Sequence, residues 1–186
     1  KEDLIIGIQT IIMKKNLEEI VELINWVQQD SRLGSIYFQA IVQPNFSSSG
    51  EGWFTDNEWH KRNEFNFLWP DDTKKVHAVI DELIRFKKCG FKIANPIGQL
   101  EAFKVYFSDP QEFNKNVKCN KGRCIFSVSP TGDITLCHSY GILGNVRNAD
   151  IDLREIWFSE QANEMRNKMN NCSKYCGPLV NCYYEK

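Results

Sequence analysis

Cysteine is the residue type with the clearest chemical pattern in this chain. The chain has seven cysteines, and six of them form two groups toward the C-terminus. These six, spaced C-x4-C-x12-C and then C-x3-C-x5-C, are Cys119, Cys124, Cys137, Cys172, Cys176 and Cys182. Thiols in two separated groups predict one metal site that is assembled from both ends of a small domain.

The spacing of the thiols bears on which metal centre they would hold. Neither group contains the C-x2-C pair that zinc knuckles usually use. An iron-sulfur cluster also takes four cysteine thiolates, and because it is larger than a single ion we expect it to accept wider and unequal spacings. Nothing in the sequence directs export, so we expect a cytoplasmic chain with reduced thiols. The spacing favours a cluster, with zinc and, more distantly, structural disulfides as open alternatives.

The elements around the first group of cysteines are expected to form a hairpin. Residues 125–128 and 134–136 are predicted to form two strands that are joined by a turn at residues 130–133. Gly132 in this turn tolerates a positive φ. This hairpin would bring Cys137 beside Cys119 and Cys124. Residues 144–145 are predicted to form a turn, and Asp152 to cap one helix that runs to about residue 169 and leads toward the second group.

The first half of the chain alternates between strand and helix patterns. Residues 4–12 and 36–42 are predicted to be strands, and residues 17–29 a helix that begins at Asn16, so the three should form a βαβ unit with parallel strands. Residues 45–72 are predicted to form a long ordered loop rich in tryptophan. Helices are expected at 73–88, ended by Gly90, and at 97–106, with a short strand at 91–93 between them.

Other candidate residues carry weaker signals. Cys89 is expected to pack as a small buried hydrophobic residue. His138 could ligate metal or donate to a cluster sulfur, although a supporting or surface role is favoured. His60 and His77 are expected to be structural or exposed to solvent. Arg123 could tune a cluster or hold a carboxylate, and a surface role in a turn is as well supported.

The tryptophans of the long loop could have either of two roles. Trp53, Trp59 and Trp69 could line the mouth of a substrate site, but packing over the open end of a sheet would need the same residue types.

Composition excludes some classes of partner. With 23 basic against 24 acidic side chains, the net charge is −1, so the chain has no excess of positive charge to attract nucleic acid. No apolar run in the sequence is long enough to span a bilayer. The first residue is Lys1 and an apolar strand begins almost at once, so we expect the C-terminal part of a longer protein.

Several short motifs, taken in combination, resemble one known family. They are Cys119-Asn-Lys-Gly122, Gly132-x4-Cys137, Gly144-Asn145-Val146, Leu153-Arg-Glu-Ile-Trp157 and Cys172-x3-Cys176. Together, over about residues 110–186, they resemble the SPASM/twitch extension of radical S-adenosylmethionine (SAM) enzymes. More weakly, Gly7-Ile8-Gln9-Thr10 and Phe38-Gln39-Ala40 look like the last strands of the partial β/α barrel in the same enzymes.

The resemblance implies a fold and a domain organisation. Residues 1–108 would be α/β elements from the C-terminal end of a partial barrel with linker helices. Residues 109–186 would be a small α+β, cysteine-rich SPASM/twitch-like domain with a hairpin and a helix. The missing N-terminal barrel would then be the principal partner.

The resemblance also implies cofactors and ligands. Cys119 and Cys137 match the hairpin ligands of an auxiliary 4Fe-4S cluster, and Cys172 with Cys176 match the pair that closes the site. Cys124 and Cys182 would be alternates or members of a fuller set. The sequence departs from the family pattern in two ways: the closing pair is C-x3-C rather than C-x2-C, and no further cysteine follows Cys182, so six thiols cannot fully ligate two clusters. One cluster is therefore expected, with a second, partly ligated cluster as the alternative.

The implied function is that of a radical SAM enzyme's C-terminal part, whose cluster transfers electrons or anchors a peptide, protein or small-molecule substrate. SAM and the catalytic 4Fe-4S cluster are expected only in the full-length protein, because the C-x3-C-x2-C motif is absent here and the chain alone should not cleave SAM. A flavodoxin or ferredoxin is the expected type of reductant. The alternatives are a standalone cluster carrier or redox module, and a zinc-stabilised binding domain.

Overall fold

The computed structural model describes residues 4–44, 56, 58–137, 139–148, 152–172 and 176–182. The chain divides into two compact units, each described by itself below. The first unit contains residues 1–116 and 175–185, and the second contains residues 117–174 and 186. The domain boundary between residues 108 and 109 stays a prediction from the sequence.

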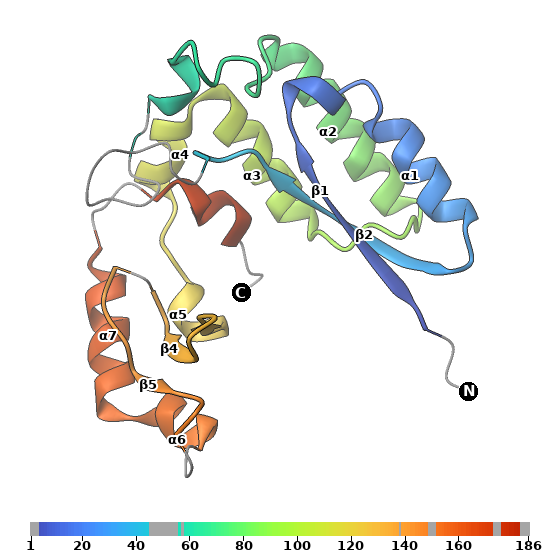
Figure 1. The fold of residues 1–186 in the computed structure, drawn as a ribbon. Coiled ribbons are helices and arrows are strands. Elements are labelled where there is room, and N and C mark those ends of the chain that lie inside the picture. Colours follow the sequence, from blue (N-terminus) through green and yellow to red (C-terminus); the bar gives the residue numbers. More distant parts are fainter. Residues whose placement is uncertain are drawn as a thin grey trace. The chain divides into compact units, whose positions relative to one another are not determined.

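A parallel strand pair forms the sheet of the first unit (Figure 1). Strand β1 (Ile6–Ile12) pairs in parallel with β2 (Leu33–Ala40), and helix α1 (Ile20–Gln29) connects them and packs on β2. An isolated bridge from Ile36 to Ile93 adds one further parallel position beyond β2. The predicted βαβ unit with parallel strands is confirmed, and the chain has the mixed α/β character that the sequence predicts.

The start of helix α1 differs from the prediction. Asn16 does not cap the helix; its side chain accepts a hydrogen bond from the Met13 N–H at 3.0 Å and donates to the Ile11 carbonyl at 2.8 Å. These bonds close a 3₁₀ turn at Lys14–Asn16, and the α-helix begins only at Ile20. The predicted start at residue 17 is wrong because the Asn16 side chain bonds backward to the end of β1.

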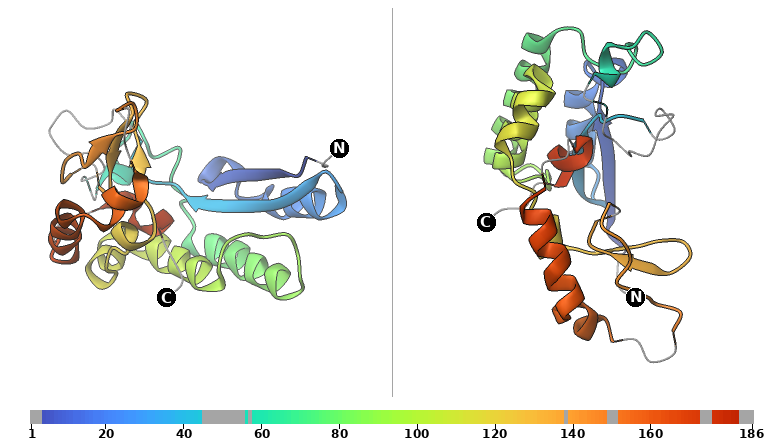
Figure 2. Two further views of the ribbon diagram at one scale, coloured as in Figure 1. Left: turned by 90° about the horizontal axis from the view of Figure 1, so that it is seen from below. Right: turned by 90° about the vertical axis from the view of Figure 1, so that its left-hand side faces the viewer.

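Two long helices cover one face of the strand pair (Figure 2). Helix α2 (Thr73–Lys88) has the predicted bounds: the Asp72 carboxylate caps its first turn, and Gly90 with φ of 83° follows its end. It packs against α3 (Ile97–Ser108), which runs two residues longer than predicted. The short helix α4 (Pro110–Asn116), which the sequence analysis did not predict, packs on α3.

Tryptophan side chains contribute to the core of the first unit. Trp59, in the 3₁₀ helix η2 (Trp59–Lys61), is fully buried and packs edge-on against Trp69, whose ring also contacts Tyr106 and Phe107. The packing interpretation is therefore the correct one for Trp59 and Trp69. Trp53 and the rest of residues 45–55 lie outside the described residues.

A buried polar network occupies the edge of β2. The Asn95 side chain accepts from the Phe38 N–H at 2.7 Å and donates to the Phe38 carbonyl at 2.8 Å, as a neighbouring strand would. It also donates to Gln99 at 2.8 Å, and the Gln99 amide donates to the Tyr37 hydroxyl at 2.7 Å. Asn95 and Gln99 are both fully buried, so the network satisfies groups that water cannot reach.

The second unit combines a small antiparallel sheet with short helices. Strands β3 (Ser127–Val128) and β4 (Asp133–Thr135) form the predicted hairpin, and Gly132 adopts a φ of 94° in its turn. The predicted turn at residues 144–145 is instead strand β5 (Gly144–Asn145), which pairs with β4. The Asn145 amide donates to the Asp133 carboxylate at 2.7 Å, which helps to hold this third strand in place.

The single helix predicted between Asp152 and Met169 is two helices. Helix α6 (Leu153–Phe158) begins at the predicted cap, where the Asp152 carboxylate accepts from the N–H groups of Arg154 and Glu155. Ser159 then adopts an extended conformation, and its hydroxyl accepts from the Ala162 N–H to start α7 (Glu160–Asn170). A second capping residue inside the pattern therefore interrupts the helix.

Across the part of the chain that the structure describes, no helix is both long enough and apolar enough to cross a membrane.

Replacement of Asn95 by alanine should destabilise the first unit. Truncation leaves the buried N–H and carbonyl of Phe38 without their side-chain partners, and we expect a loss of about 3 kcal/mol in the free energy of unfolding. Chemical denaturation checks this, with the exposed Asn66→Ala as the matched control. Equal midpoints for the two variants would show that the Asn95 bonds add little.

Candidate metal centre

A small apolar core brings the cysteine-bearing elements of the second unit together. Its buried members come from β4's C-terminal end and from one face of α7: Leu136, Ala162, Met165 and Met169. Cys119 and Cys137 both pack against this core. Helix α7 ends at Asn170, and the Cys172 N–H donates back to the Met169 carbonyl at 3.2 Å. The hairpin thus brings Cys137 to this core, and the end of α7 leads directly to Cys172, which is exposed.

Close packing against α7 holds the turn that follows Cys119. Helix α5 (Lys121–Cys124) packs on α7, and an added Cβ at Gly122 would lie 2.9 Å from the Met169 sulfur. Only glycine fits there without a shift of the methionine. The Gly122 backbone therefore lies in close contact with α7, three residues after Cys119.

Thr135 fixes the backbone at Cys137. The Cys137 N–H donates to the Thr135 hydroxyl at 3.1 Å, and that hydroxyl lies 2.8 Å from the Cys137 carbonyl and 2.6 Å from the Gly141 carbonyl. The Tyr140 N–H donates to the same Cys137 carbonyl at 3.1 Å. Thr135 is 7% exposed, so these bonds are shielded from water and stabilise the turn around the cysteine.

Three thiols and one phenol in the second unit lie close enough to interact electrostatically. Burial raises the pKa of Cys119, the Lys121 N–H opposes this by donating to the sulfur, and Cys137 and Cys172 add smaller effects. The Tyr140 hydroxyl is hydrogen-bonded to Cys172, and this bond, with burial and the three thiols, raises the pKa of Tyr140 to about 12. Cys119, Cys137 and Cys172 therefore lie near enough to influence one another.

Two observations bear on the kind of metal that these thiols suit. Among the described residues, no three cysteine, histidine or carboxylate side chains converge closely enough to hold one metal ion. The mutual effects among Cys119, Cys137 and Cys172 nevertheless show that they are neighbours. Cysteine thiolates ligate both iron-sulfur clusters and structural zinc. The chemistry of the donor set therefore fits an iron-sulfur cluster, and it fits a four-cysteine zinc site equally.

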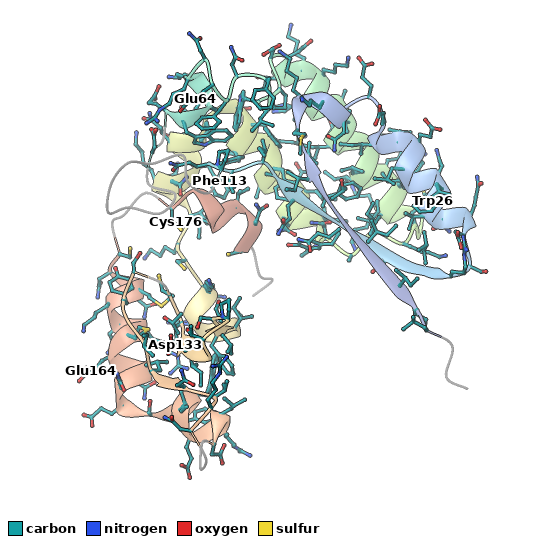
Figure 3. The ribbon with its side chains drawn as sticks, viewed as in Figure 1. Trp26, Glu64, Phe113, Asp133, Glu164 and Cys176 are labelled. Carbon is teal, nitrogen blue, oxygen red and sulfur yellow. The ribbon has the colours of Figure 1, made fainter. Side chains whose placement is uncertain are left out.

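The structure places the other predicted ligands differently. Cys124, in the last position of α5, is exposed. Cys176 and Cys182 belong to the first unit, where Figure 3 shows Cys176 near Phe113 of α4. The Cys176 N–H donates to the Asn114 side chain at 3.3 Å, and Cys182 ends the 3₁₀ helix η3 (Gly177–Cys182), which packs on α3 and β2. All seven cysteines lie in the described residues, and none forms a disulfide.

Cys89 and the histidines were the weaker candidates from the sequence. Cys89 is exposed at the C-terminal end of α2, so the predicted burial is wrong. His77 is structural, with its Nε2 3.0 Å from the Lys104 carbonyl, and the half-buried His60 packs on Trp69. His138 lies outside the described residues.

Comparison with known protein families then bears directly on this part of the chain. Residues 119–183 match the SPASM family, an iron-sulfur cluster-binding domain. The SPASM match contains all six clustered cysteines, and it begins at Cys119, the residue whose turn packs on α7. It indicates iron-sulfur cluster binding by this segment. No curated protein and no solved structure matches the chain.

Sequence reasoning missed the residues that hold the SPASM cysteines in place. Tyr140, Thr135 and Arg166 contact the cysteines or their turns, yet none was a candidate. Thr135 lies two residues before Cys137, which is the only signal that could have marked it. Tyr140 and Arg166 carry no such signal, because their roles depend on how the hairpin and α7 pack.

Replacement of Thr135 by valine should loosen the turn at Cys137. Valine keeps the shape but leaves the Cys137 N–H without an acceptor, and we expect the second unit to lose about 2 kcal/mol of stability. The matched control is Thr131→Val in the exposed hairpin turn, for which we expect less than about 1 kcal/mol because water replaces its bonds. Circular dichroism during thermal unfolding checks both; equal losses would contradict a special role for Thr135.

Proposed function

We propose that residues 119–183 bind a 4Fe-4S cluster that serves as the auxiliary centre of a radical SAM enzyme. The observation that carries this proposal is the SPASM match, which coincides with a group of three neighbouring thiols in the second unit. Bound there, such a cluster supplies one-electron transfer or an iron atom at which a substrate can be anchored.

Cys119, Cys137 and Cys172 are the ligands that the second unit would provide. Each is held by backbone bonds or by packing on the core that the hairpin and α7 share. The resemblance in sequence assigns Cys176 as the fourth ligand, with Cys124 and Cys182 as alternates. The Lys121 N–H and the Tyr140 hydroxyl, which contact the sulfurs of Cys119 and Cys172, would stabilise negative charge on the bound thiolates.

The first unit supports the proposed enzyme context. Its parallel βαβ arrangement is the repeating element of β/α barrels, and helices α2 and α3 cover one of its faces (Figure 2). Among the described residues β1 pairs on one side only, and Leu4 and Ile5 before it are 83% and 71% exposed. An apolar strand edge of this kind favours a further parallel strand as its neighbour. We propose that this neighbour is the N-terminal part of a radical SAM barrel.

In this proposal the chain does not cleave SAM by itself, because the cysteine motif of the catalytic cluster is absent from its sequence. Catalysis would need the barrel and a one-electron reductant such as a flavodoxin or ferredoxin. The substrate would be a peptide, a protein or a small natural product that is modified by radical chemistry.

The metal content of the anaerobically reconstituted protein tests the proposal. We expect about four iron and four sulfide per chain, with broad visible absorbance. Cys119→Ala, Cys137→Ala and Cys172→Ala should each lose most of the cluster. Cys89→Ala is the matched control, since Cys89 is exposed in the first unit and should be dispensable.

The same analysis assigns the fourth ligand through Cys124→Ala, Cys176→Ala and Cys182→Ala, and we expect the Cys176 variant to lose the cluster. About one zinc and no sulfide per chain would overturn the proposal and support a zinc-stabilised domain.

A further inference from the structure

Arg166 of α7 connects three parts of the second unit through one side chain. Its Nε donates to the Gly122 carbonyl at 2.8 Å, one terminal nitrogen donates to the Trp157 carbonyl at 2.7 Å, and the other donates to the Asn163 side chain at 2.8 Å. The guanidinium also stacks over the Trp157 ring, 4.6 Å from its centroid. All three nitrogens are therefore engaged in a half-buried setting.

The bond to Gly122 holds the turn that contains Cys119. Gly122 follows Cys119 by three residues, and the intervening Lys121 directs its N–H at the Cys119 sulfur. Gly122 lies in close contact with the Met169 side chain, and the Arg166 bond opposes movement of the turn away from α7. The two contacts together restrain the turn relative to the helix.

We propose that Arg166 is a positioning residue for the cluster ligand Cys119. This inference rests on the proposed cluster-binding function and adds to it a residue that does not touch the metal. Arg166 holds the Gly122 carbonyl, and the turn thereby keeps both the Cys119 sulfur and the Lys121 N–H in place. Hydrogen bonds to cluster sulfurs and their orientation set the stability and reduction potential of a cluster.

The chemistry of the side chain explains why arginine is needed. A planar guanidinium can donate to two carbonyls and stack on an indole ring at the same time. Lysine could reach one of the two carbonyls but would not form the fork that joins Gly122 to Trp157. Glutamine is shorter and uncharged, and it would lose both the fork and the stacking.

The test compares Arg166→Gln with Arg154→Gln in reconstituted protein. Arg154 is an exposed arginine on neighbouring α6, so its replacement removes the same charge without affecting the turn. We expect the Arg166 variant to release its iron to a chelator roughly tenfold faster than wild type, as is typical when a residue that supports a metal ligand is lost. We also expect a changed electron paramagnetic resonance spectrum of the reduced cluster. Arg166→Lys should be intermediate, and Arg154→Gln should match wild type.

The outcomes separate this inference from the proposed function. If wild-type protein holds no cluster, the proposed function fails. If wild type holds a cluster and Arg166→Gln releases iron at the wild-type rate with an unchanged resonance spectrum, the positioning role is refuted. A purely structural role would lower the melting temperature of the metal-free protein and leave the spectrum unchanged. Should Arg166→Gln fail to fold, the Arg166→Lys spectrum and release rate decide the question.

Discussion

The arrangement of the second unit depends on one patch of apolar packing. Leu136, at the end of the hairpin, and the buried face of α7 form a core that leaves the neighbouring cysteines at its margin. The core is small for a segment of about 60 residues, and segments of that size usually need a further source of stability. Thiolate–metal bonds formed by Cys119, Cys137 and Cys172 would supply it, because metal binding at such a site is coupled to folding. Packing brings the thiols together, and the cluster would then fix the packing.

The first unit uses polar side chains where a sheet would normally use a strand. Asn95 pairs with both backbone groups of Phe38, and Asn181 does the same with Ala40, at 2.8 Å for each bond. Asn181 lies in η3, so this pairing attaches the end of the described chain to β2. The segment that contains Cys176 and Cys182 is therefore attached to β2 and belongs to the first unit.

The sequence predicted the elements whose signals are local. Helix α2 has its predicted bounds because its apolar period, the Asp72 cap and Gly90 agree, and the hairpin follows from Gly132 between two short strands. Two helix predictions were wrong. The start of α1 was misplaced because the Asn16 side chain bonds back toward β1 instead of capping the helix, and α6 and α7 were predicted as one helix because Ser159 is a second capping residue inside a periodic pattern.

For the site, spacing and resemblance identified the cysteines, but not how they divide between the units. Cys172 and Cys176 are only four residues apart, yet Cys172 bonds to the end of α7 and Cys176 to Asn114 of α4. No local pattern marks that division. The role of Arg166 could not be predicted for a similar reason. It depends on a hydrogen bond to the Gly122 carbonyl, and the sequence does not show that these two residues are close in space.

We propose that the cysteines of the SPASM segment hold a cubane iron-sulfur cluster. Mössbauer spectroscopy of protein reconstituted anaerobically with ⁵⁷Fe is the decisive experiment, because the spectrum reports the type of centre as well as its presence. We expect most of the iron to give the doublet of delocalised mixed-valence pairs that marks an oxidised 4Fe-4S cluster. A spectrum dominated by a 2Fe-2S centre, or by isolated high-spin iron, would contradict it.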